Sequence, residues 1–144
     1  MLNILLAEDN PGDVFLIKLA LKKHEIPYVM FVVNDGAEAL NFVRGMGKPG
    51  KPPCPDLLLL DINLPKAEGF EVLSEFRKRA ECASTHVIIV TSSGASSDRA
   101  RMTALGVDGY FCKPPELADF MRLGQVIRHV VSRRTTGSPA SFVE

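Results

Sequence analysis

Four consecutive leucines, Leu57 to Leu60, limit the fold of this chain more than any other feature. A segment that is apolar at every position offers no side to solvent, so as a β-strand it must be buried on both faces. Strands of that kind occur mostly in parallel sheets that helices cover on both sides. The run then meets a charge, Asp61, and ends a few residues later at Pro65. The sequence therefore predicts a central parallel strand with a polar group at its carboxyl end.

Short apolar runs alternate along the chain with segments of helical periodicity. We expect strands at residues 3–7, 28–33, 56–61, 86–90 and 109–112, and helices at about 11–24, 35–43, 69–79, 96–105 and 116–133. Five such βα units favour an α/β fold, a five-stranded doubly wound parallel sheet with helices on both faces. We expect residues 1–133 to form one domain without an output domain, and residues 134–144, which lack periodicity, to be a flexible tail.

Polar residues mark the expected helix starts. Asn10 is typical of a helix cap, and Asp35 with Glu38 forms a capping-box pattern. We expect Ser96 or Ser97 to cap the fourth helix. The last helix is expected to run unbroken, with one apolar stripe that comprises Leu117, Phe120, Met121, Ile127 and Val131.

Charge argues against nucleic acid or an anionic membrane as a partner. The formal net charge is zero, so the chain has no strong basic field. The basic run Arg128, His129, Arg133 and Arg134 is interpreted instead as complementing the dipole of a helix end. The first residues also lack the basic segment and the long apolar run of a signal peptide or membrane span. We therefore expect a cytoplasmic protein.

The three cysteines are odd in number and lack the spacing of a metal site. In the cytoplasm thiols stay reduced. We therefore expect three free thiols, with Cys112 in the core and Cys54 and Cys82 on the surface.

Polar side chains that suit metal and phosphate chemistry follow four of the expected strands. Glu8 and Asp9 follow the first strand, Asp61 the third, Thr91 the fourth and Lys113 the fifth. Because the carboxyl ends of parallel strands share one edge of the sheet, we expect these residues to converge there. Each residue alone is explained more simply as a cap, a strand residue or a surface charge. Their joint placement favours a functional site.

The chemistry of this set indicates phosphoryl transfer. Clustered carboxylates raise each other's pKa values unless a cation lies among them, and Mg²⁺ accepts such hard oxygen ligands together with water and a phosphate oxygen. Lys113 can pair with a carboxylate or a phosphoryl group, and Thr91 can donate a hydrogen bond to a phosphoryl oxygen. Asp61 beside the cation can act as a nucleophile towards phosphorus, which gives an aspartyl phosphate.

The motifs resemble, in their order, the receiver domain of two-component response regulators, such as the single-domain chemotaxis Y protein. The resemblance covers about residues 2 to 131 and rests on LLAEDN, on LLLLDINLP with the following EGFEVL, on VIIVTSS and on GYFCKP. It implies a flavodoxin-like receiver fold with the strand order 2-1-3-4-5 and a role as a single-domain response regulator in a phosphorelay.

The resemblance also implies roles for the acidic residues and the lysine. Asp61 would be the phosphoacceptor, and Lys113 would bind the phosphoryl group. Glu8, Asp9 and Asp61 would hold Mg²⁺ or Mn²⁺, with Asp9 as the direct ligand of the acidic pair. Asn63 would add its backbone carbonyl to the metal site.

A switch is implied by the same resemblance. Thr91 would be drawn towards the phosphoryl group, and Tyr110 would swing inward with it. The surface of the fourth helix, fifth strand and last helix would then change its partner preference. The bond between Lys113 and Pro114 would be cis.

The AEDNPGD opening and the long Gly/Pro loop before the third strand resemble a subgroup of small regulators. These serve bacterial phytochromes and related histidine kinases, and some of them dimerise. The resemblance thus implies a sensor histidine kinase as a partner, with a bacterial phytochrome as one candidate. The downstream partner would be another protein or a phosphotransfer protein, and a homodimer stays an alternative to a monomer.

Two other functions fit parts of the pattern. Phosphatases with an aspartyl nucleophile typically have a D-x-D motif, in which the second Asp acts as general acid and base. This chain has Asn63 at the second position. We therefore expect no turnover of external substrates, only assistance to the chain's own phosphorylation and autodephosphorylation. The second function is a binding module that is no longer phosphorylated. Such a module would be expected to lack a residue essential for phosphorylation, and this sequence lacks none of them.

Overall fold

The computed structural model describes residues 1–133, and its centre is a five-stranded parallel sheet. The strand order is β2-β1-β3-β4-β5, which confirms the predicted topology. The strands are β1 (Leu2–Ala7), β2 (Tyr28–Val33), β3 (Leu57–Leu60), β4 (His86–Thr91) and β5 (Gly109–Cys112). The residues 134–144, for which we predicted a flexible tail, lie outside the described part of the chain.

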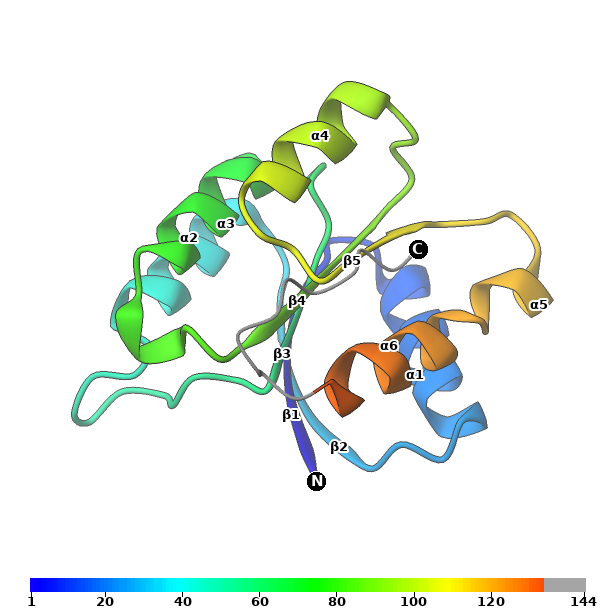
Figure 1. Cartoon of the computed structure of the whole chain (residues 1–144), viewed down its shortest axis with the longest axis horizontal. Helices are drawn as coiled ribbons and strands as arrows, with labels where there is room; N and C mark the ends of the chain where they lie inside the picture. Colours follow the sequence, from blue (N-terminus) through cyan, green and yellow to red (C-terminus); the bar gives the residue numbers. More distant parts are fainter. Residues whose placement is uncertain (134–144) are drawn as a thin grey trace.

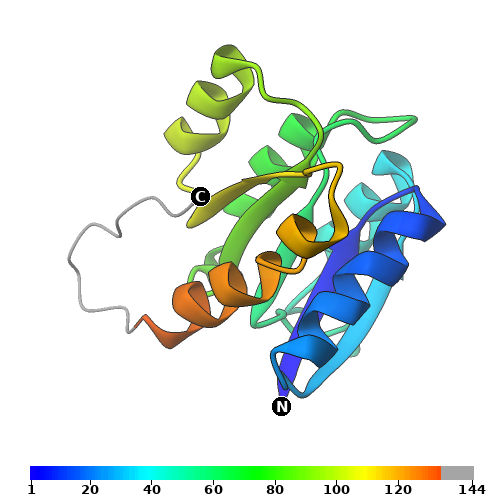
Figure 2. The same cartoon turned by 90° about the vertical axis from the view of Figure 1, so that its right-hand side faces the viewer.

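Helices cover both faces of the sheet, as Figures 1 and 2 show. The helices α1, α5 and α6 lie on one face, and α2, α3 and α4 lie on the other. No helix within residues 1–133 is both long enough and apolar enough to cross a membrane. The helices are α1 (Pro11–Lys23), α2 (Gly36–Gly45), α3 (Gly69–Arg77), α4 (Ser96–Ala104), α5 (Leu117–Phe120) and α6 (Leu123–Ser132), with a short 3₁₀ helix, η1 (Ala80–Cys82), after α3.

The four leucines of β3 divide the core between the two layers. Leu58 and Leu60 pack in the cluster with α2 and α3, and Leu57 and Leu59 pack in the cluster with α1 and α6. None of the four is exposed at all. Alternate side chains of a strand point to opposite faces, so only a run that is apolar throughout can serve both layers. The prediction of a doubly buried central strand is confirmed.

Two of the predicted helix caps are confirmed, and the third is wrong. The Asn10 side chain accepts hydrogen bonds at the start of α1, and the Asp35 side chain accepts one from the Glu38 N–H. At α4 the cap position is Ala95, without a side-chain bond. The nearby Ser93 hydroxyl instead donates to Asp98 in the first turn of α4, at 2.6 Å.

The predicted unbroken last helix is two helices, because a contact with α1 interrupts it. The Met121 carbonyl accepts from the Gly124 N–H and lies 3.0 Å from Nε2 of His24 at the end of α1. Its bond therefore spans three residues instead of the four of an α-helix. Leu117, which we placed on the apolar stripe, is 55% exposed.

The prediction of three free thiols is wrong. Cys54 and Cys82 form a disulfide, with Cα atoms 5.3 Å apart, and Cys82 is buried. The Gly/Pro loop of Cys54 folds back onto η1, where the Arg79 guanidinium donates to the Met46 carbonyl at 3.1 Å. Cys112 is a free thiol but is exposed, because it ends the edge strand β5.

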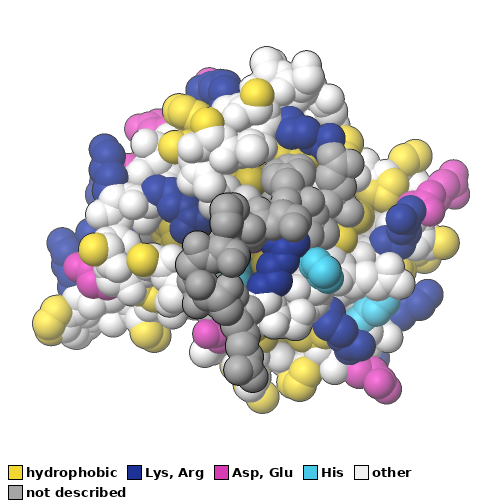
Figure 3. Space-filling model, viewed as in Figure 1, with side chains coloured by type: hydrophobic (Ala, Val, Ile, Leu, Met, Phe, Trp, Pro, Cys, Tyr) yellow, Lys and Arg dark blue, Asp and Glu magenta, His cyan; other side chains and the backbone are white. Residues whose placement is uncertain are grey.

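Charged side chains do not gather into one basic field on the visible face. Figure 3 shows Lys and Arg side chains scattered among other residue types there. In the basic run near the end, Arg128 donates to the His24 carbonyl and so ties α6 to α1. Arg134 of that run lies outside the described residues.

The close contact of Gly124 with α1 predicts that adding one methyl group at this position lowers the stability of the protein. In Gly124→Ala the added Cβ would collide with the His24 ring and lie 2.9 Å from the Ala20 carbonyl oxygen. We expect the overpacking to lower the free energy of unfolding by about 1–3 kcal/mol, despite the helix propensity of alanine. In the control Gly45→Ala the nearest atom is 3.5 Å away on the flexible Lys51 side chain. Urea unfolding checks both variants, and equal stability of the two would contradict the contact.

Candidate functional site

The strand register brings the predicted site residues to one edge of the sheet. Ala7 of β1 pairs with Leu60 of β3, so the next residues of the two strands, Glu8 and Asp61, lie side by side. The Asp61 N–H donates to the Ala7 carbonyl at 3.1 Å. On the other side, the Lys113 N–H donates to the carbonyl of Thr91, the last residue of β4, at 2.7 Å.

The approach of α3 to this edge requires a glycine. The Gly69 N–H donates to the Ile62 carbonyl at 3.1 Å. A Cβ at Gly69 would lie 2.8 Å from the Asp61 carbonyl oxygen, closer than a side chain can come. Glycine at this position therefore lets α3 begin directly against the end of β3 and holds the Asp61 backbone in place.

Three carboxylates bind the ammonium of Lys113. Its Nζ donates to Glu8 Oε1 at 2.7 Å, to Asp13 Oδ2 at 2.8 Å and to Asp61 Oδ2 at 2.9 Å. An ammonium has three N–H donors, so this arrangement uses all of them. Asp13 was missed from the sequence, where it looks like an ordinary acid in the first turn of α1. Only its place at a helix start on the carboxyl edge could have indicated it.

Burial shifts the pKa values of the charged groups in this cluster. Glu8 is 1% exposed and Asp61 5% exposed. Burial, the largest influence, raises the pKa of Glu8 to about 7, against the hydrogen bond and charge of Lys113. Burial alone would lower the pKa of Lys113, but the hydrogen bonds to Asp13, Glu8 and Asp61 raise it above its ordinary value.

The acidic residues can hold a divalent cation. One carboxylate oxygen each from Glu8, Asp9 and Asp61 lies within 4.8 Å of the others, and Asp9 is exposed to solvent. Such an all-oxygen set suits Mg²⁺ or Mn²⁺. The Asn63 N–H donates to Asp61 Oδ1 at 2.9 Å and so orients that carboxylate. The role of the Asn63 carbonyl as a metal ligand stays a prediction.

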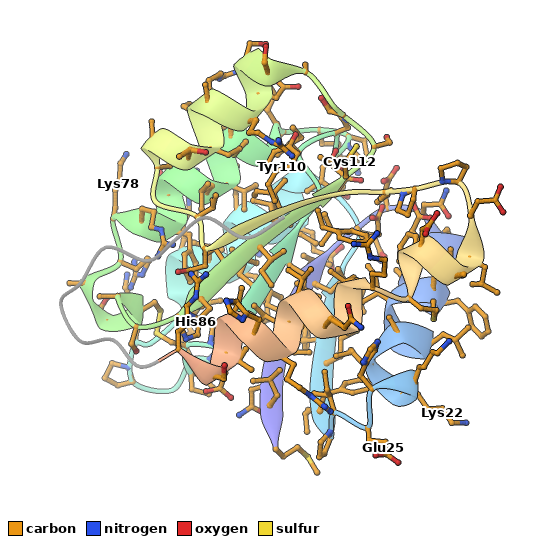
Figure 4. All side chains as sticks on the ribbon, turned by 45° about the vertical axis from the view of Figure 1, so that its right-hand side comes forward. Lys22, Glu25, Lys78, His86, Tyr110 and Cys112 are labelled. Carbon is orange, nitrogen blue, oxygen red and sulfur yellow. A yellow bond between two sulfur atoms is a disulfide. The ribbon has the colours of Figure 1, made fainter. Side chains whose placement is uncertain are left out.

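Thr91 and Tyr110 are linked through Ser93. The fully buried Thr91 hydroxyl oxygen accepts from Asn63 Nδ2 and from the Ser93 N–H, each at 3.3 Å. The Tyr110 hydroxyl donates to the Ser93 carbonyl at 2.8 Å. Tyr110 is 1% exposed and lies beneath α4, as Figure 4 shows. The ring that we predicted to swing inward is therefore already inside in this structure.

The predicted cis bond between Lys113 and Pro114 is wrong. No peptide bond within residues 1–133 is cis. The trans form is the more stable one for a bond to proline, by about 0.5–1 kcal/mol. In this conformation the Lys113 ammonium still reaches all three of its carboxylate partners.

Known proteins share this fold and this arrangement of sequence motifs. A family model described as the response regulator receiver domain matches residues 4–123. The chain belongs to this family. The response regulator Rcp1 of Synechocystis sp. is 34% identical over 124 residues, which are 86% of this chain and 84% of that protein.

Two solved structures of such regulators superpose closely on this chain. The Mn²⁺-bound form of Rcp1 has a TM-score of 0.78 at 33% identity, over 89% of this chain and 92% of that one. The phosphorylated cyanobacterial phytochrome response regulator RcpA has a TM-score of 0.78 at 31% identity, over 97% and 99%. The response regulator family and the phytochrome-associated relatives agree with the resemblance found in the sequence.

The raised pKa of Glu8 predicts a pH-dependent stability. Between about 4.5, its ordinary pKa, and about 7, the folded state binds more protons at Glu8 than the unfolded state does. Its contribution to stability is therefore present below this interval and is lost as the pH rises through it, by up to about 1.4 kcal/mol per pH unit. Glu8→Gln should remove this slope, as measured by urea unfolding in EDTA.

The exposed acid Glu71 provides a control for that measurement. Glu71→Gln should keep the pH dependence of the wild type. If Glu8→Gln and the wild type lose stability equally across the interval, the buried carboxyl of Glu8 does not titrate as described.

Proposed function

We propose that this receiver domain acts in a phosphorelay, in which Asp61 accepts a phosphoryl group from a histidine kinase. The observation that carries the proposal is the 2.9 Å contact of Asp61 with Lys113, beside the acidic cluster at the carboxyl edge of the sheet. A carboxylate oxygen of Asp61 forms the new bond to phosphorus. The bond from phosphorus to the kinase histidine nitrogen breaks, and that nitrogen keeps the electron pair.

The other residues of the site bind and orient the reacting groups. Glu8, Asp9, Asp61 and the Asn63 carbonyl would hold Mg²⁺ or Mn²⁺, which when bound offsets charge on the phosphoryl oxygens. Lys113, which donates to Asp61 Oδ2 at 2.9 Å, would pair with the same oxygens. The Asn63 N–H fixes the direction of the Asp61 carboxylate.

A conformational switch would follow from the bonds around Thr91. A dianionic phosphoryl group attracts the Thr91 hydroxyl as a donor, whereas that hydroxyl oxygen now accepts from Ser93. Because Ser93 also binds Tyr110 and Asp98, a shift of Thr91 would change contacts at β5 and α4. The surface of α4, β5 and the last two helices would thereby change its affinity for a partner.

The partners are proposed from the relatives and from the charge. Because RcpA is a phytochrome response regulator, a phytochrome-type histidine kinase is the proposed phosphodonor, in the cytoplasm. The output would pass to another protein or to a phosphotransfer protein, from the monomer or from a homodimer. The zero net charge supports neither nucleic acid nor a membrane as a partner.

Phosphoryl uptake tests this function directly. With Mg²⁺ and labelled acetyl phosphate we expect one acid-stable label per chain in the wild type, and none in Asp61→Asn or in EDTA. Asp56→Asn provides a matched control, because Asp56 precedes β3 at the opposite end of the same strand. Absence of label in the wild type, or equal label in Asp61→Asn, would favour a phosphorylation-independent binding module.

The proposal also includes the absence of turnover on external substrates. Asn63 stands where such a phosphatase would have a second acid. An amide side chain does not act as a general acid or base at neutral pH. We expect no steady-state release of phosphate from a generic phosphate ester in the presence of Mg²⁺. Release that disappears in Asp61→Asn would identify the chain as a phosphatase instead.

A further inference from the structure

Asp13 is the one carboxylate at Lys113 that belongs to neither the metal cluster nor the strand ends. It comes from the first turn of α1, and its Oδ2 lies 2.8 Å from Lys113 Nζ, across 100 residues of sequence. The side chain of Lys113 is 10% exposed and that of Asp13 24% exposed. The contact is therefore partly buried, which shields it from the screening that weakens surface ion pairs.

The position of Asp13 is fixed by Asn10. The Asn10 side-chain oxygen accepts from the Asp13 N–H at 3.1 Å, and the Asn10 N–H donates to Glu8 Oε2 at 3.2 Å. Asp13 and Glu8 are thus held by the same residue. An acid that only complements the helix dipole needs no particular direction. The Asp13 carboxylate instead points at the ammonium of Lys113.

The other two partners of Lys113 have competing tasks. Glu8 Oε1 and Asp61 Oδ2 face the lysine, while their second oxygens already accept from backbone N–H groups. A cation bound by Glu8 and Asp61, or a phosphoryl group on Asp61, would compete with Lys113 for these oxygens. Asp13 lies outside the metal cluster, so its bond to the lysine can persist throughout.

We propose that Asp13 is a positioning residue that keeps the Lys113 ammonium beside Asp61 while cation and phosphoryl group bind. A lysine ammonium sits on a flexible four-carbon stem, so one retained charged partner strongly limits where it can lie. This inference rests on the proposed phosphorylation of Asp61, and it deepens that function by assigning a residue that aligns the lysine.

The first test needs neither metal nor phosphate. In the metal-free full chain, the ¹H–¹⁵N signal of the Lys113 ammonium should be observable by NMR because its hydrogen bonds slow proton exchange. Asp13→Asn should speed this exchange by about tenfold or more, the effect of losing a charge-assisted hydrogen bond. Glu71→Gln is the matched control, since Glu71 occupies the first turn of α3 as Asp13 does that of α1. Unchanged exchange in Asp13→Asn would overturn the proposal.

The second test separates an effect on Lys113 from one on the cation. With a small-molecule phosphodonor at saturating Mg²⁺, Asp13→Asn should lower the maximal rate of Asp61 phosphorylation about tenfold. Its Mg²⁺ affinity by calorimetry should change less than about threefold, because Asp13 is not a ligand of the cluster. The conservative variant Asp13→Glu should recover most of the rate. A tenfold loss of Mg²⁺ affinity with an unchanged maximal rate would overturn the positioning role.

Failure of this inference is distinct from failure of the proposed function. A wild-type chain that takes no label refutes the phosphorylation of Asp61. A wild-type chain that is labelled, with Asp13→Asn labelled equally fast, refutes only the role of Asp13. If Asp13→Asn does not fold, Asp13→Ala is measured in its place. Faster ammonium exchange and a lower rate in the folded variant support the proposal, and wild-type values of both overturn it.

Discussion

The site depends on one partly buried ammonium, that of Lys113, and the three carboxylates around it. Burying an ammonium or a carboxylate alone costs several kcal/mol, so each of these groups requires the others. Glu8 follows β1, Asp61 follows β3, and Lys113 follows β5 two strands further along the sheet. The cluster can form only if these strands end at the same level. The fully buried leucines of β3 fix that level, because both helical layers pack against them.

The same arrangement connects the site to the opposite helical layer. Asn63 binds both Asp61 and Thr91, and Thr91 is linked through Ser93 to Tyr110 and α4. Each link is a single hydrogen bond between groups that are at least partly buried. We therefore expect a new charge at Asp61 to change the hydrogen-bond partners along this short chain of bonds, which ends at α4.

The fold and most of the site were predictable because they follow from local patterns. Fully apolar runs indicated the parallel sheet, and strand ends indicated Glu8, Asp61, Thr91 and Lys113. Asp13 was missed because a first-turn acid already has a sufficient local explanation.

The errors of prediction have tertiary causes. The break between α5 and α6 depends on the contact of His24 with Met121 and Gly124, which no helical periodicity encodes. The disulfide depends on how a Gly/Pro loop folds onto η1. The conformation of such a loop cannot be predicted from sequence periodicity, so the proximity of its cysteine to η1 was missed.

We expect charge added at Asp61 to be transmitted through Asn63 and Thr91 to α4 and β5. Backbone NMR of the full chain with Mg²⁺, before and after addition of beryllium fluoride as a phosphoryl mimic, tests it most directly. We expect shifts that begin at Asp61, Lys113 and Thr91 and extend through Ser93 to Tyr110 and α4, with β2 unchanged. Shifts confined to the residues next to Asp61, or no shifts at all, would contradict it.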